Sequence, residues 1–142
     1  MTSVEFHFNA EERLQAVCRL AAQIVARGER LLIYAPEPEV ASRLDRLMWT
    51  SPATGFVPHC ASDDALAPAT PVLIARDDEA PADVRVLVNL AAECPPHYAR
   101  FERLVEVVGT DEVEREAGRN RYREYKARGY AISNHDLAKA NG

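Results

Sequence analysis

The chain has 142 residues, of which 47% are hydrophobic and 27% charged, a balance that is typical of a globular protein and excludes a disordered or collagen-like chain. Its length predicts one domain over residues 1–142. The net charge of −5 argues against general binding of the nucleic-acid backbone, because such binding needs a surplus of Lys and Arg.

The first predicted element is a strand in which apolar residues alternate with Glu5 and His7. This alternation predicts one face toward the core and one wet face. Apolar residues at helical spacing follow from Leu14 to Val25. Gly28 is expected to end that helix, because glycine readily adopts the left-handed conformation.

Residues 31–35 form a continuous apolar run, which is typical of a central strand buried on both faces. An apolar stripe between residues 40 and 48 predicts a second helix, and Ser51-Pro52 is expected to stop it. The remaining patterns predict a short extended segment over 56–59, a loop over 60–70, strands over 72–75, 84–90 and 104–108, a helix over 111–128 with Thr110 as N-cap and Gly129 as its end, and a polar tail over 133–142 that frays.

Strands that alternate with helices predict a three-layer α/β fold, with a mostly parallel, twisted sheet and helices on both faces. Such sheets commonly bind nucleotides through glycine-rich loops at the carboxyl ends of the strands. None of the six glycines forms such a motif, and the turn after residues 31–35 is Pro36-Glu37-Pro38-Glu39, a poor cradle for phosphate. We therefore expect a nucleotide-binding-like fold that lacks the phosphate-binding loop and uses no cofactor.

Catalytic and metal-binding motifs are sparse. Cys94 and His97 have a C-x-x-H spacing, but a closed zinc site needs four converging ligands, so a buried thiol and a surface histidine are the favoured interpretation. No G-x-S-x-G motif is present. We also expect no carboxylate within an apolar run, where burial would shift its pKa. We expect neither catalytic residues nor a metal site, and a nucleotide-dependent enzyme is a disfavoured alternative.

The start of the chain and its cysteines bear on localisation. The first five residues lack the basic start and the apolar stretch of a signal peptide, and no apolar run reaches the roughly 18 residues that span a bilayer. Cys18, Cys60 and Cys94 are odd in number and widely spaced, which favours reduced thiols. These features predict a cytoplasmic protein that does not contact the membrane.

The only tryptophan belongs to a first candidate binding surface. Trp49 lies about 100° around the helix from Met48, which puts it at the rim of the apolar stripe. Phe56 and Pro58 point to one side of the short extended segment. Exposed aromatic anchors beside an edge segment are typical of protein interfaces. The alternative, that Trp49 folds back onto the core, fits the pattern equally well.

The last helix forms a second candidate surface. Between residues 115 and 128, six basic residues stand against two acidic ones. One helical face, at the spacing i, i+4, i+7 and i+11, carries Arg115, Arg119, Tyr122 and Lys126. Guanidinium donors beside an aromatic wall suit a carboxylate-bearing peptide with an apolar end. The alternative is an ordinary solvated helix whose basic end complements the helix dipole.

A series of motifs runs through nearly the whole chain. They are Arg43-Leu44-Asp45, Leu47-Met48-Trp49, Pro52, Phe56-Val57-Pro58-His59, Pro71-Val72, Asp83, Val88-Asn89-Leu90, Phe101, Val105-Glu106-Val107-Val108 and Arg119-x-Arg121-Tyr122-Arg123-x-Tyr125-Lys126-x-x-Gly129-Tyr130. In this order and spacing, the chain resembles the chi subunit of bacterial DNA polymerase III holoenzyme. The combination of the Trp, the Phe-x-Pro-His segment and the Arg/Tyr-rich helix makes the resemblance specific.

The resemblance implies an accessory subunit of the replicase that has no catalytic site of its own. It implies one surface for the psi subunit, which connects chi to the clamp loader, and the residues that match this surface by position are Trp49, Phe56 and Pro58. It implies another surface for the acidic C-terminal tail of single-stranded DNA-binding protein, which ends in Pro-Phe. The residues that match the tail-binding pocket are Val108, Arg115, Arg119 and Tyr122, with Lys126 on the same helical face.

Two functions therefore compete. The leading hypothesis is a link between the clamp loader and single-stranded DNA-binding protein, in which DNA is reached only indirectly. The alternative is direct binding of single-stranded nucleic acid by the basic helix, which predicts a steep dependence on salt. The acidic chain, and the lack of an aromatic row beyond Tyr122 and Tyr125, disfavour that alternative.

Overall fold

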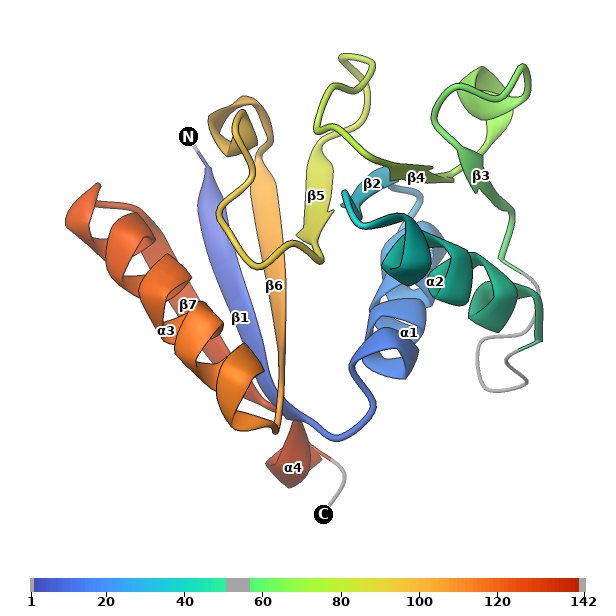
Figure 1. Cartoon of the computed structure of the whole chain (residues 1–142). Helices are drawn as coiled ribbons and strands as arrows, with labels where there is room; N and C mark the ends of the chain where they lie inside the picture. The colour runs from blue at the N-terminus through green and yellow to red at the C-terminus, as the bar shows by residue number, and fades with distance from the viewer. Residues whose placement is uncertain (1, 51–56, 141–142) are drawn as a thin grey trace.

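The computed structural model describes residues 2–50 and 57–140, and its strands form one seven-stranded sheet (Figure 1). The strand bounds are Ser3–Ala10 (β1), Leu31–Tyr34 (β2), His59–Ala61 (β3), Val72–Ala75 (β4), Val86–Asn89 (β5), Arg103–Gly109 (β6) and Ala131–Asp136 (β7). The helix bounds are Arg13–Ala26 (α1), Pro38–Thr50 (α2), Glu112–Ala127 (α3) and Leu137–Ala140 (α4), with short 3-10 helices at Ala67–Ala69 and Tyr98–Arg100. The strands lie in the order β3-β4-β2-β5-β6-β1-β7, and each neighbouring pair is parallel.

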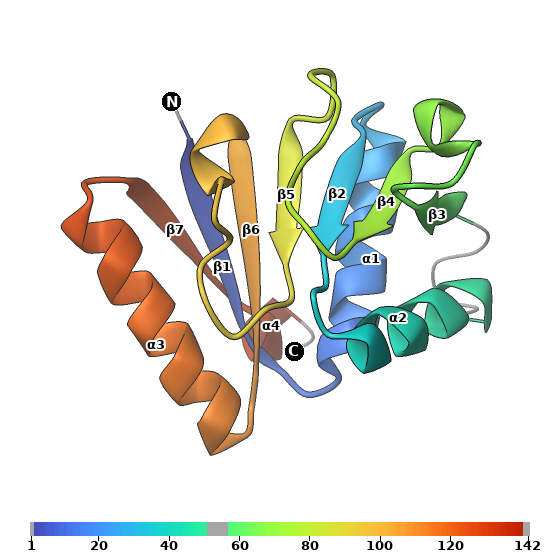
Figure 2. The ribbon, with the colours of Figure 1, turned by 45° about the horizontal axis from the view of Figure 1, so that its top comes forward.

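Helices cover both faces of the sheet, which confirms the predicted three-layer α/β fold (Figure 2). α1 and α2 lie on one face, and α3 lies on the other. In β2, Leu31 and Ile33 pack with α1 and α2, whereas Leu32 belongs to the cluster that contains Tyr125 of α3. Burial on both faces is what a continuous apolar run predicts. Over the described residues, no helix has the length and apolar character needed to cross a membrane.

The helix ends follow the local sequence, with one correction. Gly28 and Gly129, just beyond α1 and α3, have φ angles of 82° and 83°, which glycine adopts without strain. Their predicted role in ending the helices is confirmed. Thr110 is not the N-cap of α3, because Asp111 takes that position and its side chain accepts a hydrogen bond from the Glu114 backbone N–H at 2.9 Å.

The C-terminal segment differs from the predicted tail. Residues 133–136, which the sequence pattern assigned to a fraying polar tail, belong to β7 and pair in parallel with β1. β7 is an edge strand with mostly exposed side chains, so it carries few apolar residues and is held by backbone pairing. α4 follows it directly, and residues 141–142 lie outside the described part of the chain.

The pairing of β7 changes the surroundings of β1. β1 lies between β6 and β7, so it is an interior strand. His7 is only 8% exposed, and Glu5 is partly buried. The predicted wet face at Glu5 and His7 therefore looks into a hollow bordered by α1, β6 and β7 instead of open solvent.

Candidate protein-binding site

α3 and the sheet beneath it form a hollow of about 360 Å³, here called the α3 hollow. Side chains of β1, β6 and β7 line one side of it, and side chains of α3 line the other. Four of the five residues predicted for tail binding line it, namely Val108, Arg115, Arg119 and Tyr122. The end of β6 and one face of α3 thus bring these four residues to one place.

The floor of the α3 hollow is apolar. Val108, near the end of β6, is 6% exposed. α3 approaches it closely because Gly118 has no side chain: a Cβ at position 118 would lie 2.9 Å from Val108 Cγ2. On the other side, the Tyr122 ring packs edge-on against Phe6, with centroids 5.2 Å apart. These contacts make a recess that suits an apolar or aromatic group.

Two arginines stand at the rim of this recess. Arg115 and Arg119 are both exposed. Arg119 Nη2 donates to Glu112 Oε1 at 2.8 Å, and Arg115 Nη2 donates to Asn9 Oδ1 at 3.4 Å. Exposed contacts of this kind stabilise little, so both guanidinium groups can turn to an incoming carboxylate, which they bind well.

Lys126 does not line the α3 hollow. It is exposed, about one turn beyond Tyr122 on α3. The helical face predicted from the spacing therefore extends past the recess, and Lys126 adds positive charge beside it without contributing to its walls.

The first candidate surface lies at the C-terminal end of α2. Trp49 is 58% exposed, so the alternative in which it folds back onto the core is wrong. Its ring packs beside that of His59, with centroids 4.9 Å apart, and His59 Nε2 lies 3.3 Å from Asp45 Oδ1. Pro58 is exposed and its neighbours Val57 and His59 are buried, as the alternation predicted.

Phe56, the third residue assigned to that surface, lies outside the described residues. The remaining two residues, Trp49 and Pro58, lie beside β3, which is the strand at one edge of the sheet. An exposed indole beside an edge strand is a suitable anchor for a partner protein.

A family model described as DNA polymerase III chi subunit, HolC, matches residues 1–133. The chain belongs to this chi subunit family. Relatives named DNA polymerase III subunit chi come from Pseudomonas aeruginosa (32% identity over 98% of this chain and 99% of the relative), Escherichia coli (29%, 84% and 82%) and Haemophilus influenzae (27%, 87% and 86%). Membership of the chi family confirms the resemblance and makes the protein an accessory subunit of DNA polymerase III in DNA replication.

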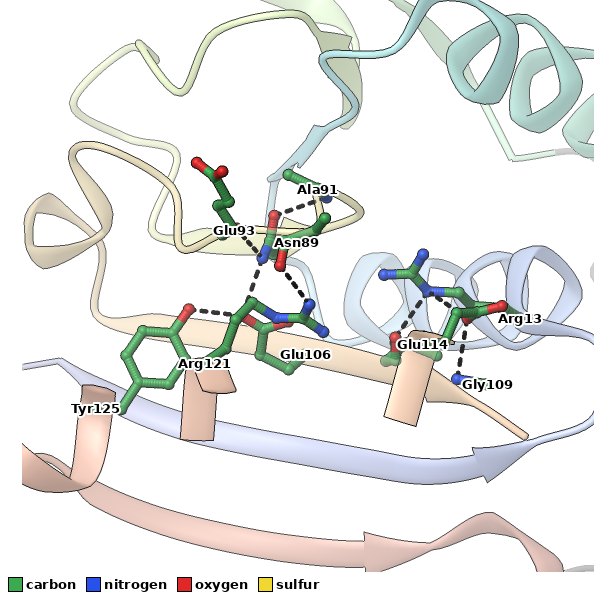
Figure 3. Close-up of polar contacts among 11 residues, drawn as sticks. Arg13, Asn89, Ala91, Glu93, Glu106, Gly109, Glu114, Arg121 and Tyr125 are labelled. Carbon is green, nitrogen blue, oxygen red and sulfur yellow. Dashed lines mark hydrogen bonds and ion pairs between the residues drawn. The ribbon is translucent and has the colours of Figure 1, made fainter. Parts of the chain in front are cut away.

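Sequence reasoning missed a buried polar network that holds α3 of this chi-family protein to the sheet (Figure 3). Glu106, in the middle of β6, is fully buried. Arg121 Nε donates to Glu106 Oε1 at 2.9 Å, and the Tyr125 hydroxyl donates to Glu106 Oε2 at 2.6 Å. Asn89 of β5 donates to the same Oε2 at 3.0 Å. Three donors from two elements thus converge on one carboxylate.

The charge states in this network follow from its burial. Burial raises the pKa of Glu106, and the adjacent Arg121 guanidinium opposes that rise. Burial and the neighbouring carboxylate both raise the pKa of Tyr125, so its hydroxyl stays protonated and remains a donor. Removing one partner of an ion pair that is buried this deeply is strongly destabilising, because the other charge is left buried and unpaired.

The network corrects two expectations for the chi-family chain. Glu106 is a carboxylate in an apolar run, between Leu104-Val105 and Val107-Val108, although no such carboxylate was expected. Arg121 was counted with the surface charges of the last helix, yet it is only 3% exposed. The one available signal was an acidic residue inside the predicted strand 104–108, whose other residues are all apolar.

A second set of contacts clamps the first turn of α3 to the end of β6 (Figure 3). Glu114 Oε1 accepts a hydrogen bond from the Gly109 backbone N–H at 3.1 Å. Arg13 of α1 lies 3.4 Å from the same oxygen and donates to the Val107 carbonyl at 2.8 Å. These contacts fix the helix start, and with it the direction in which Arg115 and Arg119 project.

Cys94 and His97 have different surroundings. His97 Nδ1 lies 2.9 Å from Asp78 Oδ1. Burial raises the pKa of the Cys94 thiol to about 12, so the thiol is protonated at neutral pH. All three cysteines are free thiols.

Proposed function

We propose that this chi-family protein links the clamp loader, through the psi subunit, to the C-terminal tail of single-stranded DNA-binding protein, and that it catalyses no reaction itself. The observation that carries the proposal is the α3 hollow, in which an apolar floor lies beneath two exposed guanidinium groups. This function places the protein at the bacterial replisome, in the cytoplasm.

The chemistry of the tail matches the α3 hollow part by part. The terminal phenyl ring enters the recess over Val108 and against Tyr122, where full burial of such a side chain contributes about 1.5–3 kcal/mol. The terminal carboxylate pairs with Arg119, and a hydrogen bond to a charged group adds about 1.5–3 kcal/mol. Arg115 attracts the aspartates that precede Pro-Phe.

Lys126 acts in this scheme through charge alone. Because it lies outside the recess, its attraction for the acidic segment is screened by salt, with a screening length of about 8 Å at physiological ionic strength. We therefore expect Lys126 to contribute less to affinity than Arg119, and its contribution to disappear first as salt rises.

The psi subunit is assigned to the surface around Trp49, Phe56 and Pro58. Trp49 is an exposed aromatic anchor in that region, and β3 beside it is the outermost strand on its side of the sheet. The strand order puts β3 at one edge and β7, which borders the α3 hollow, at the other. Partners on opposite edges can bind at the same time, as an adaptor requires.

The tail-binding half of the proposal is tested by calorimetry with an acidic peptide that ends in Pro-Phe. Arg119→Ala should weaken binding at least tenfold, and Arg123→Ala, the matched control on the same helix, should leave it unchanged. Arg123 is exposed, and its Nη1 donates to Asn120 Oδ1 of the same helix at 2.9 Å. Equal affinities of the Arg119→Ala variant and the unsubstituted chain would refute this site.

The psi half is tested separately. Trp49→Ala should abolish the complex with psi and leave peptide affinity unchanged. Loss of peptide binding in this variant, or an intact complex with psi, would contradict the assignment of two independent surfaces. Tight binding of a bare single-stranded oligonucleotide by the unsubstituted chain would instead favour the direct nucleic-acid function.

A further inference from the structure

On the sheet face opposite α3, a second hollow of about 770 Å³ lies between α1 and the strands β6, β1 and β7. It is larger than the α3 hollow and takes no part in the proposed function. Glu5, His7 and His135 line it. Their ligand-type atoms all lie within 4.8 Å of one another.

The strand register explains this grouping. β1 and β7 are parallel neighbours in which His7 is directly opposite His135. The two imidazole rings stack, with centroids 4.5 Å apart and an angle of 13° between their planes. Glu5 precedes His7 by two residues on β1, so it points to the same face, and its Oε1 lies 3.5 Å from His7 Nε2.

His7 is the unusual member of the group. It is only 8% exposed, yet neither of its ring nitrogens has a hydrogen-bond partner among the described residues. Buried polar groups are nearly always satisfied, because leaving one unpaired costs free energy. The contact with Glu5 at 3.5 Å is too long for a good hydrogen bond. An imidazole in this condition is suited to donate its lone pair to a metal ion.

Glu5 is ready for the same role. Arg103 Nε and Nη2 donate to its two carboxylate oxygens at 2.8 and 3.3 Å. Arg103 also contacts Glu29 Oε1 at 3.1 Å, which offsets its positive charge. Carboxylate ligands of metals are commonly oriented by such outer partners.

We infer that Glu5, His7 and His135 bind one divalent transition-metal ion, with Zn²⁺ as the fitting representative. Two imidazoles and one carboxylate are a regular ligand set for Zn²⁺, and the fourth position faces the hollow, where water can occupy it. His135 is exposed, its Nε2 lies 3.2 Å from Ser133 Oγ, and its ring stacks on that of His7. It can therefore turn toward the ion at little cost.

Such an ion would cross-link the edge strand β7 to the interior strand β1. β7 is otherwise held to the sheet on one side only, because it is the outermost strand. The expected consequence is slower local opening of residues 131–136 when the ion is bound.

The test is calorimetric titration of ZnCl₂ into the unsubstituted chain and into two matched variants. We expect one equivalent to bind the unsubstituted chain, with at least tenfold weaker binding to His135→Gln and unchanged binding to His97→Gln. His97 is the matched control because its imidazole lies outside the group, paired with Asp78. Glutamine keeps a hydrogen-bonding side chain in both variants, and neither substitution empties a core position.

A second measurement distinguishes this site from binding to the thiols. Hydrogen exchange of the β7 amides should slow when Zn²⁺ is added to the unsubstituted chain and to His97→Gln, but not to His135→Gln. Absence of saturable binding would overturn the inference. Equal affinity of His135→Gln, or Zn²⁺ binding without protection of β7, would overturn it as well.

Discussion

Replacing Arg121 with methionine should destabilise the protein severely. The arginine is 3% exposed, and its guanidinium contacts both the Glu106 carboxylate and the Ala92 carbonyl, each at 2.9 Å. Methionine fills similar space but leaves Glu106 buried with only the neutral donors Tyr125 and Asn89. Removing one partner of a buried ion pair costs about 3–5 kcal/mol. That is a large part of the 5–15 kcal/mol by which domains are typically stable.

A double-mutant cycle makes the reasoning specific. Glu106→Gln alone should also destabilise, because it leaves the Arg121 charge unpaired. The free energy of unfolding of the double variant should fall by less than the sum of the decreases in the two single variants, since no unpaired charge remains. Urea unfolding followed by circular dichroism measures all four free energies of unfolding. A loss below about 1 kcal/mol for Arg121→Met, or strictly additive losses, would refute the account of this network.

Three further outcomes are expected. Gly118→Ala should lower tail-peptide affinity several-fold, because the new Cβ would lie 2.9 Å from Val108 Cγ2 and push helix and strand apart; unchanged affinity by calorimetry would contradict the described floor. Glu112→Gln should raise tail-peptide affinity by up to about fivefold, since it frees Arg119 from a surface ion pair worth about 0–1 kcal/mol; a lower affinity would argue against that competition. Cys18, whose pKa burial raises to about 11, should resist iodoacetamide at pH 8 in the native protein and react in urea, as mass spectrometry would show; rapid native alkylation would contradict its burial.

The strands that the sequence predicts well are those with uniform surroundings. Residues 31–35 and 72–75 are continuous apolar runs, and they supply β2 and β4, which lie inside a parallel sheet. β7 gives no such signal, because solvent covers most of its side chains and its pairing uses the backbone. Missing β7 also made the polar face of β1 look open to water.

The part of the candidate site that lies on one helix, α3, could be predicted from the sequence. Arg115, Arg119 and Tyr122 share a face because of helical periodicity, and the structure brings all three to the α3 hollow. Periodicity could not separate Arg121, which has the same residue type on the same helix but is buried. Its burial depends on Glu106 in a different element, and a pairing between distant polar residues leaves no local pattern.

The central claim, that the α3 hollow receives an acidic tail ending in phenylalanine, is tested most directly by fluorescence anisotropy. A labelled acidic peptide that ends in Pro-Phe and a matched peptide without the terminal Phe would each be titrated with the full chain at moderate salt. Saturable binding of the first peptide and its loss in the second is the predicted result. Equal binding of both peptides, or saturable binding of neither, would contradict the account.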